Sequence, residues 1–185
     1  MKIIPTHIAG LVVIEPIVFN DHRGYFFESY NQIKFIGNGI STRFVQDNES
    51  KSVRGTIRGL HYQLNPYAQS KLVRVIEGEV YDVAVDIRKG SSTFGQWHGE
   101  ILSAENKKQF FIPKGFAHGF SVLSETAIFY YKCDNVYHPE CERGIVYNDQ
   151  TLKINWKIPA GEAIISPKDL IQKSFSEAEM NFIFQ

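Results

Sequence analysis

The chain has 185 residues, of which 43% are hydrophobic and 22% are charged, and this length favours one domain with a single core. Its 20 basic and 20 acidic residues cancel, so the charge balance predicts neither a nucleic-acid partner nor a membrane partner. The opening residues lack a signal-peptide pattern, and no apolar stretch approaches the roughly 20 residues of a membrane span, so we expect a cytoplasmic protein.

Most of the chain reads as short strands separated by Gly, Pro, Asn and Asp. The predicted strands are 11–19, 42–50, 56–63, 71–77, 80–87, 95–103, 109–113, 117–124 and 127–135. Helices are predicted only at 31–37 and 176–182. The pair 71–77 and 80–87 is predicted to form a hairpin around Gly78. Many short strands with little helix predict an all-β fold, either an antiparallel sandwich, a jelly roll or a small barrel.

Alternation along these strands predicts a polar interior. The predicted shared faces are Lys71/Val73/Val75, Phe44/Gln46/Asn48/Ser50 and Ala127/Phe129/Tyr131/Cys133. Buried polar groups cost stability unless they are paired, so such an interior suits a ligand cavity better than a core.

The stretch GFAHGF (115–120) follows Pro113 and gives the spacing P-x-G-x-x-H, which ends at His118. This spacing resembles the second motif of the cupin superfamily, a β jelly-roll barrel. Many cupins use that histidine as a metal ligand beside an H-x-H and a glutamate in their first motif. The corresponding region here holds His61 alone, and Cys133 and Cys141 form no C-x-x-C pair. We therefore expect no metal and no other cofactor, and favour acid–base chemistry.

A longer series of motifs, in order along nearly the whole chain, resembles the dTDP-4-dehydrorhamnose 3,5-epimerase family. The motifs are FNDHRGYFFESY (19–30), RGLHYQ (58–63), QSKLVRVIEGEVYDVAVDIRKGSSTFGQWHGEILS (69–103), NKKQFFIPKGFAHGF (106–120), YYKCDNVYHPECERGI (130–145) and SPKD (166–169). The resemblance implies a metal-free cupin jelly roll with a few short helices. It also implies one domain over 1–185, whose N-terminal segment of about 50 residues contributes to a homodimer.

The resemblance further implies the conversion of dTDP-4-dehydro-6-deoxy-D-glucose to dTDP-4-dehydro-L-rhamnose. The C4 ketone of this substrate acidifies the protons on C3 and C5. Inversion needs a base on one face, an acid on the other, and a cation or donor at the ketone oxygen. Histidine suits the base because it titrates near neutrality, and a phenol whose pKa the site lowers suits the acid.

The family motifs assign these roles. His61 matches the base, and Asp169 matches the carboxylate that orients it. Tyr131, rather than its neighbour Tyr130, matches the acid. Lys71 matches a lysine near the ketone oxygen, although its position alone also fits a strand-end lysine that reaches solvent.

The remaining matches are to substrate-binding positions. They are Arg23, Glu28, Gln46, Asp47, Asn48, Arg58, His118, Tyr137, Glu142 and Lys168. Arg23 and Arg58 suit a diphosphate, because guanidinium groups bind phosphate oxygens in a fork. A solvated surface charge is the alternative for each charged residue in this set. For His118, a structural histidine at the Pro-Gly turn is an equal alternative to a sugar ligand.

Strand parity sets a condition on RGLHYQ. Arg58 and His61 differ by an odd number, so a regular strand would point them to opposite faces. If both serve one cavity, Gly59 hosts a bulge or twist, and we predict that irregularity. The stretches VYNDQ (146–150) and INWKIPAGEAIIS (154–166) depart from the family pattern and are interpreted as loop variation.

The sequence leaves alternatives. A sister enzyme inverts only C3 or only C5 of the same nucleotide sugar. A 3,4-ketoisomerase shares the fold, but RGLHYQ and GFAHGF favour the epimerase. The presence of candidates for both base and acid argues against a non-catalytic sugar-nucleotide-binding cupin. A metal-dependent cupin oxygenase is the last alternative, and bound iron or manganese would favour it.

Overall fold

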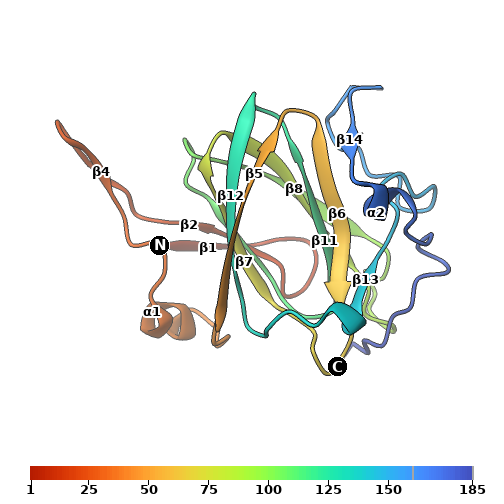
Figure 1. Cartoon of the computed structure of the whole chain (residues 1–185). Coiled ribbons are helices and arrows are strands. Elements are labelled where there is room, and N and C mark those ends of the chain that lie inside the picture. Colours follow the sequence, from red (N-terminus) through yellow and green to blue (C-terminus); the bar gives the residue numbers. More distant parts are fainter. Residues whose placement is uncertain (160, 185) are drawn as a thin grey trace.

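The computed structural model describes residues 1–159 and 161–184, and its main body is a pair of facing β-sheets (Figure 1). The strands are β1 (Lys2–Pro5), β2 (Val12–Glu15), β3 (Phe19–Asp21), β4 (Gly24–Phe26), β5 (Gln46–Val53), β6 (Thr56–Gln63), β7 (Lys71–Glu77), β8 (Glu79–Asp86), β9 (Trp97–Ser103), β10 (Gln109–Ile112), β11 (Phe116–Val122), β12 (Thr126–Cys133), β13 (Glu142–Gly144) and β14 (Ile164–Ile165). The helices are α1 (Gln32–Gly37), α2 (Pro167–Leu170) and a 3-10 turn at Pro139–Cys141.

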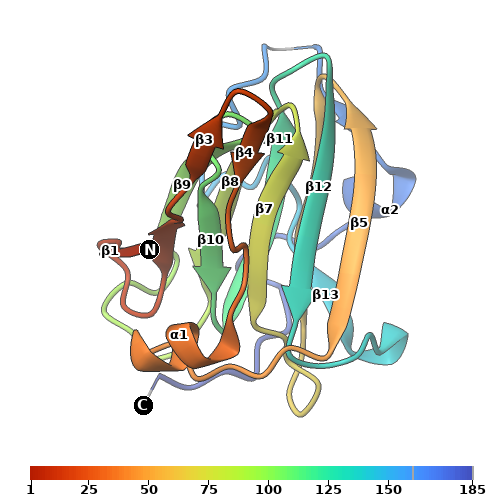
Figure 2. The same cartoon turned by 90° about the vertical axis from the view of Figure 1, so that its left-hand side faces the viewer.

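The first sheet has the order β1-β2-β10-β7-β12-β5, and the second has the order β13-β6-β11-β8-β9. The short strand β14 pairs with β6 in parallel, whereas the other pairs are antiparallel. The strands β3 and β4 form a separate hairpin that projects from the body of the barrel (Figures 1 and 2). The prediction of an all-β jelly-roll barrel with a few short helices is confirmed. Within the described ranges, no helix is long and apolar enough to cross a membrane.

The core lies between the two sheets and on their outer faces. Between the sheets, Val73 and Val75 pack with Phe129 and Phe120. The outer face of the second sheet is covered by the C-terminal part of the chain, including Trp156. The outer face of the first sheet is covered by α1 and the segments beside it. Phe44 packs in this last cluster, so its predicted place on the face of Gln46 is wrong.

The predicted hairpin of 71–77 and 80–87 is also wrong. The strand β7 pairs with β10 and β12, whereas β8 pairs with β9 and β11. The chain therefore passes from one sheet to the other at Gly78, where φ is +78°. A Cβ at Gly78 would lie 2.1 Å from the carbonyl oxygen of Thr126, so this corner has no room for a side chain. A glycine between two apolar runs marks a turn, but not whether the two strands pair.

The predicted helix at 176–182 is absent from the described chain. Met180 and Phe182 instead pack into the cluster on the outer face of the second sheet. The backbone beside them runs along the β8–β9 connection, where Lys89 and Ile183 form a parallel bridge. Tertiary packing of the two apolar side chains outweighs a weak local helix preference here.

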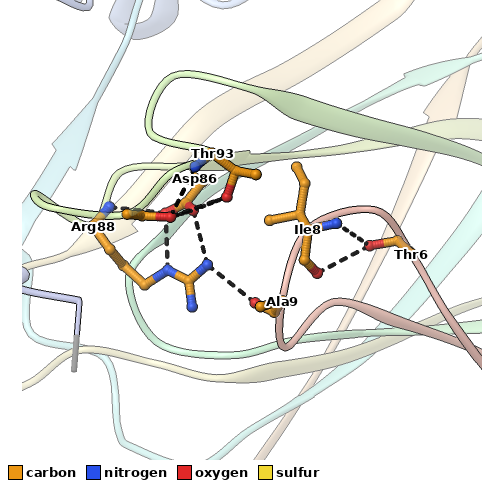
Figure 3. Close-up of polar contacts among 7 residues, drawn as sticks. Thr6, Ile8, Ala9, Asp86, Arg88 and Thr93 are labelled. Atoms are coloured by element: carbon orange, nitrogen blue, oxygen red, sulfur yellow. Dashed lines mark hydrogen bonds and ion pairs between the residues drawn. The ribbon is translucent and has the colours of Figure 1, made fainter.

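A buried ion pair fastens the end of β8 to other segments (Figure 3). Asp86 is fully buried and accepts hydrogen bonds from the guanidinium of Arg88 and from the hydroxyl groups of Ser91 and Thr93. The same guanidinium donates to the carbonyl oxygen of Ala9, in the loop after β1. This cluster therefore joins β8, the loop that follows it and the N-terminal loop.

Candidate functional site

A cavity of about 660 Å³ opens between β5 and β6 and reaches into the space between the sheets. Seven of the residues matched from the sequence line it. They are Arg58, His61, Lys71, His118, Tyr131, Lys168 and Asp169. His61 and Tyr131 therefore face one cavity, although they come from different sheets.

The backbone irregularity predicted at Gly59 is present and explains how Arg58 and His61 reach the same cavity. Arg58 pairs with Phe120 and His61 pairs with His118, so three steps along β6 span two steps along β11. Gly59 has φ of +121°, a conformation that favours glycine, and the Gly59–Leu60 peptide bond is cis. The prediction from strand parity is confirmed.

His61 and Asp169 form a hydrogen-bonded pair. The Nε2 atom of His61 lies 2.6 Å from Oδ1 of Asp169, which is almost fully buried. Asp169 sits in the first turn of α2, where Ser166 caps the helix by accepting a hydrogen bond from the Asp169 N–H. Burial alone would raise the pKa of Asp169, but the hydrogen bond from His61 lowers it, and the net shift is downward. An ionised Asp169 keeps the proton on Nε2 and leaves Nδ1 of His61 free to take a proton.

Tyr131 differs from expectation in its acidity. Burial raises the pKa of Tyr131 to about 12, although the charge of Arg58 opposes this rise. The expectation that the site lowers this pKa is therefore wrong. The phenol stays protonated at neutral pH, which is the form that a proton donor requires.

Lys71 lies beside Tyr131, with Nζ 5.7 Å from the centre of the phenol ring. Burial lowers the pKa of Lys71, and its Nζ forms no ion pair or hydrogen bond within residues 1–159 and 161–184. A cation held without a bonded carboxylate is free to bind an oxygen of a ligand.

Four more matched residues form a chain of hydrogen bonds that ends at Lys168. The amide of Gln46 donates to Asn48 and accepts from the backbone of Tyr137. The phenol of Tyr137 and the ammonium of Lys168 both donate to Oε2 of Glu142. Burial would raise the pKa of Glu142, but the Lys168 and Tyr137 hydrogen bonds lower it. These hydrogen bonds link five side chains into a row, called the polar border below, which consists of Gln46, Asn48, Tyr137, Glu142 and Lys168. Lys168 also lines the cavity, so the polar border reaches it.

Three matched residues lie apart from the cavity. Asp47 faces the outer side of the first sheet, where it accepts hydrogen bonds from Tyr130 and Lys132. Arg23, whose side chain is 79% exposed, pairs with Asp21 in the projecting hairpin. Glu28 pairs with Lys34 near α1.

Sequence reasoning missed part of the cavity wall. The additional lining residues are Ser50, Lys51, Ser52, Val53, Thr56, Ile57, Phe120, Phe129, Ile164, Ile165 and Ser166. Most are small or apolar and carry no chemical signal, although alternation did place Ser50 on a face with Asn48 and Phe129 on a face with Tyr131. Ser52 accepts a hydrogen bond from Nε of Arg58 and so fixes that guanidinium. Asp82, in the middle of β8, was also missed and bonds to His118.

The described residues contain no group of three or more His, Cys, Asp or Glu side chains placed to hold a metal ion. Both cysteines are free thiols. Burial raises the pKa of Cys133 to about 11, so this thiol is neutral near physiological pH.

Comparison with known proteins agrees with the motifs. The family model described as dTDP-4-dehydrorhamnose 3,5-epimerase matches residues 5–177. The dTDP-4-dehydrorhamnose 3,5-epimerase of Shigella flexneri is 53% identical over 180 residues, which cover 97% of this chain and 98% of that protein. A relative from Pseudomonas aeruginosa with the same name is 55% identical over 182 residues, which cover 97% and 98% of the two chains.

Solved structures agree as well. The dTDP-6-deoxy-D-glucose-3,5-epimerase of Legionella pneumophila, in complex with dTDP-4-keto-L-rhamnose, superposes with a TM-score of 0.95 at 51% identity, covering 100% of this chain and 98% of that one. A 3'-monoepimerase from Streptomyces bikiniensis was solved with dTDP as a double mutant in which a histidine and a tyrosine are replaced. It superposes with a TM-score of 0.86 at 29% identity, covering 94% of this chain and 87% of that one.

Proposed function

This chain belongs to the dTDP-4-dehydrorhamnose 3,5-epimerase family of isomerases, and we propose that His61 is its catalytic base and Tyr131 its catalytic acid. The observation that carries this proposal is that the His61–Asp169 pair and the Tyr131 phenol line one cavity. The substrate that we propose is the dTDP-linked 4-keto-6-deoxy sugar on which the curated relatives act by name.

The proposed chemistry uses His61, Lys71 and Tyr131 in turn. Nδ1 of His61 removes the proton from C3 or C5, and the electron pair moves to the C4 oxygen to give an enolate. The ammonium of Lys71 stabilises this oxygen. Tyr131 then donates its proton to the same carbon from the other face, and the enolate returns to the ketone. Solvent exchange restores the proton on Tyr131 and removes the one on His61.

The polar border would hold the nucleotide end of the substrate. Arg58 and Lys168 supply positive charge for the diphosphate. Lys168 is engaged with Glu142 in this structure and would exchange that partner for phosphate. Gln46, Asn48 and Tyr137 supply amide and phenol groups beside it.

The test of this function is solvent exchange followed by NMR. The protein is mixed with dTDP-4-keto-6-deoxyglucose in heavy water. Deuterium at both C3 and C5 is expected, deuterium at one carbon would select a single-site epimerase, and none would favour a binding protein. His61→Asn should abolish exchange at both carbons. Tyr131→Phe should keep binding and lose epimerisation, at C5 more than at C3.

The matched control for Tyr131 is Tyr130. This neighbour points to the outer face of the first sheet, where its hydroxyl donates to Asp47. Tyr130→Phe should therefore leave turnover unchanged. Equal losses in the two variants would remove Tyr131 from the mechanism.

We also propose that the chain acts as one cytoplasmic domain that forms a homodimer through its N-terminal segment. The projecting hairpin exposes Phe19, Tyr25 and Phe26, whose relative exposures are 62%, 56% and 69%. Exposed aromatic residues in such a cluster are typical of an interface. Arg23 and Glu28 lie on or beside this hairpin, so a second copy would bring them toward the cavity that they do not reach in one chain. Analytical ultracentrifugation and cell fractionation test these two points.

A further inference from the structure

Asp82 is a buried acid that the proposed mechanism does not use. It lies in β8, is 0% exposed, and presents both carboxylate oxygens to Nε2 of His118, at 3.0 and 2.9 Å. Its neighbours along the strand, Tyr81 and Val83, are apolar or largely so and point to the other side of the sheet. A buried carboxylate is destabilising unless it is paired, so its place here needs a reason beyond packing.

The partner of Asp82 faces the cavity. His118 is 6% exposed and lines the cavity, and its ring lies nearly parallel to that of Phe129, at a centre-to-centre distance of 6.1 Å. Across the described chain, Nδ1 of His118 forms no hydrogen bond, yet it is not among the polar atoms sealed from solvent. With Nε2 held by Asp82, Nδ1 is therefore the ring nitrogen that opens into the cavity.

The surrounding charges determine the protonation of this pair. Burial lowers the pKa of His118, and the positive charges of Lys71 and His61 add to that effect, although Asp82 opposes it. Burial raises the pKa of Asp82, but His118 and the Lys71 charge oppose the rise. The geometry favours the ionised form of Asp82, because both of its oxygens lie within hydrogen-bond distance of Nε2 of His118, as in a carboxylate that accepts from an N–H. His118 is then neutral, with its proton on Nε2 and a lone pair on Nδ1.

We infer that Asp82 is a positioning residue that holds His118 in the Nε2–H tautomer, so that Nδ1 accepts a hydrogen bond from a hydroxyl group of the substrate sugar. Lys71 offers only donors, and a ketone oxygen only accepts. Lys71 is thus a donor for the ketone oxygen, and Nδ1 of His118 is an acceptor for a hydroxyl group. Neither side chain can take the role of the other. This asymmetry sets the orientation of the sugar ring. The inference about the sugar rests on the proposed function, whereas the tautomer does not.

The tautomer is measured on the free enzyme. Histidine labelled with ¹⁵N in the ring gives two-bond ¹⁵N–¹H spectra that distinguish a protonated ring nitrogen from an unprotonated one, and a His118→Gln sample identifies the signal. The wild-type protein should show His118 with Nε2 protonated and Nδ1 unprotonated. A protonated Nδ1 would overturn the inference without any variant of Asp82, and whether or not the protein turns over the sugar.

The role of Asp82 is tested by Asp82→Asn, which keeps the size but removes the charge. An amide can donate or accept, so the His118 ring should populate both tautomers. The value of kcat/KM should fall by about 10- to 100-fold, as is typical when the partner of a site histidine is lost. Affinity for dTDP, which lacks the sugar, should stay unchanged in calorimetry.

Asp86→Asn is the matched control. Asp86 lies on the same strand and is also fully buried. Its side-chain partners among the described residues are Arg88, Ser91 and Thr93, none of which lines the cavity (Figure 3). This variant should lose stability but keep the wild-type His118 tautomer and the specific activity of the folded fraction. Equal losses of kcat/KM in the two variants, or wild-type kcat/KM in Asp82→Asn, would overturn the positioning role.

Discussion

Gly59 and Gly119 face each other across β6 and β11 with no room for a side chain on either. A Cβ on Gly59 would lie 2.6 Å from Cα of Gly119, and a Cβ on Gly119 would lie 2.7 Å from the carbonyl oxygen of Arg58. The two glycines belong to the stretches that also carry His61 and His118, which are paired in register. This close approach therefore sets the relative position of the two cavity histidines.

Gly119→Ala should lower stability and activity together. The added methyl group must displace the backbone of Arg58 or the ring of Trp156, and overpacking of this kind costs about 1–3 kcal/mol. Denaturant unfolding measures the loss. Gly37→Ala is the control, because no atom of residues 1–159 and 161–184 other than its own neighbours lies within 4 Å of its added Cβ, and alanine favours the helix. Equal destabilisation of the two variants would contradict the steric argument.

The alkaline limb of the pH–activity profile should belong to Lys71. The ammonium is the active form and is present below its pKa, which burial lowers from 10.5, so activity should fall before that pH is reached. The Tyr131 phenol, with a pKa raised to about 12, stays protonated throughout this range. In Lys71→Arg, whose guanidinium stays charged, the limb should disappear from the profile of residual activity. An unchanged limb in this variant would assign it to another group.

Asp86→Asn should destabilise the fold in a pH-dependent way. Burial would raise the pKa of Asp86, but the Arg88, Ser91 and Thr93 hydrogen bonds outweigh it and hold the pKa below 3.8. Its stabilisation is therefore complete above that ordinary value and is lost as pH falls through the folded-state pKa. The free energy of unfolding should drop by about 1–3 kcal/mol at neutral pH. The difference in the free energy of unfolding between variant and wild type should become smaller when unfolding is measured below pH 3.8.

Arg23 should act on the cavity of a second copy. In the homodimer that we propose, Arg23→Ala and His61→Asn protomers refolded together would form mixed dimers, in which one of two sites has both wild-type residues. Such a mixture should recover about one quarter of wild-type activity, because half of the dimers are mixed. Activity no higher than the average of the two separate variants would place Arg23 outside the partner's site.

Residue patterns were informative where a local rule applied. Alternation placed Lys71 on the inner face with Val73, and the odd spacing of Arg58 and His61 required the irregularity at Gly59. The pairing of β7 and β8 was not predictable in this way, because Gly78 looks the same in a hairpin and in a corner between sheets. The helix at 176–182 failed because Phe182 packs in a distant cluster that no local window contains.

The candidate site, like the fold, could be predicted only in part from local sequence patterns. The motifs pointed to His61, Asp169 and Tyr131, and all three line one cavity. The motifs gave no information on how burial shifts the pKa values of these groups. Burial in the assembled barrel raises the pKa of Tyr131, contrary to expectation, and depends on side chains far along the sequence. Asp82 was missed because its partner His118 lies 36 positions away, so no local stretch of sequence contains both.

The pairing of His61 with Asp169 spans 108 positions, and the carboxylate arrives only after β13, close to the C-terminal end of the chain. A chain made through Gly144 therefore has all strands from β1 to β13 but lacks the carboxylate that pairs with the proposed base. Because C-terminal residues such as Phe182 also pack on the outer face of the second sheet, a chain that ends before Asp169 should lose stability together with this pairing.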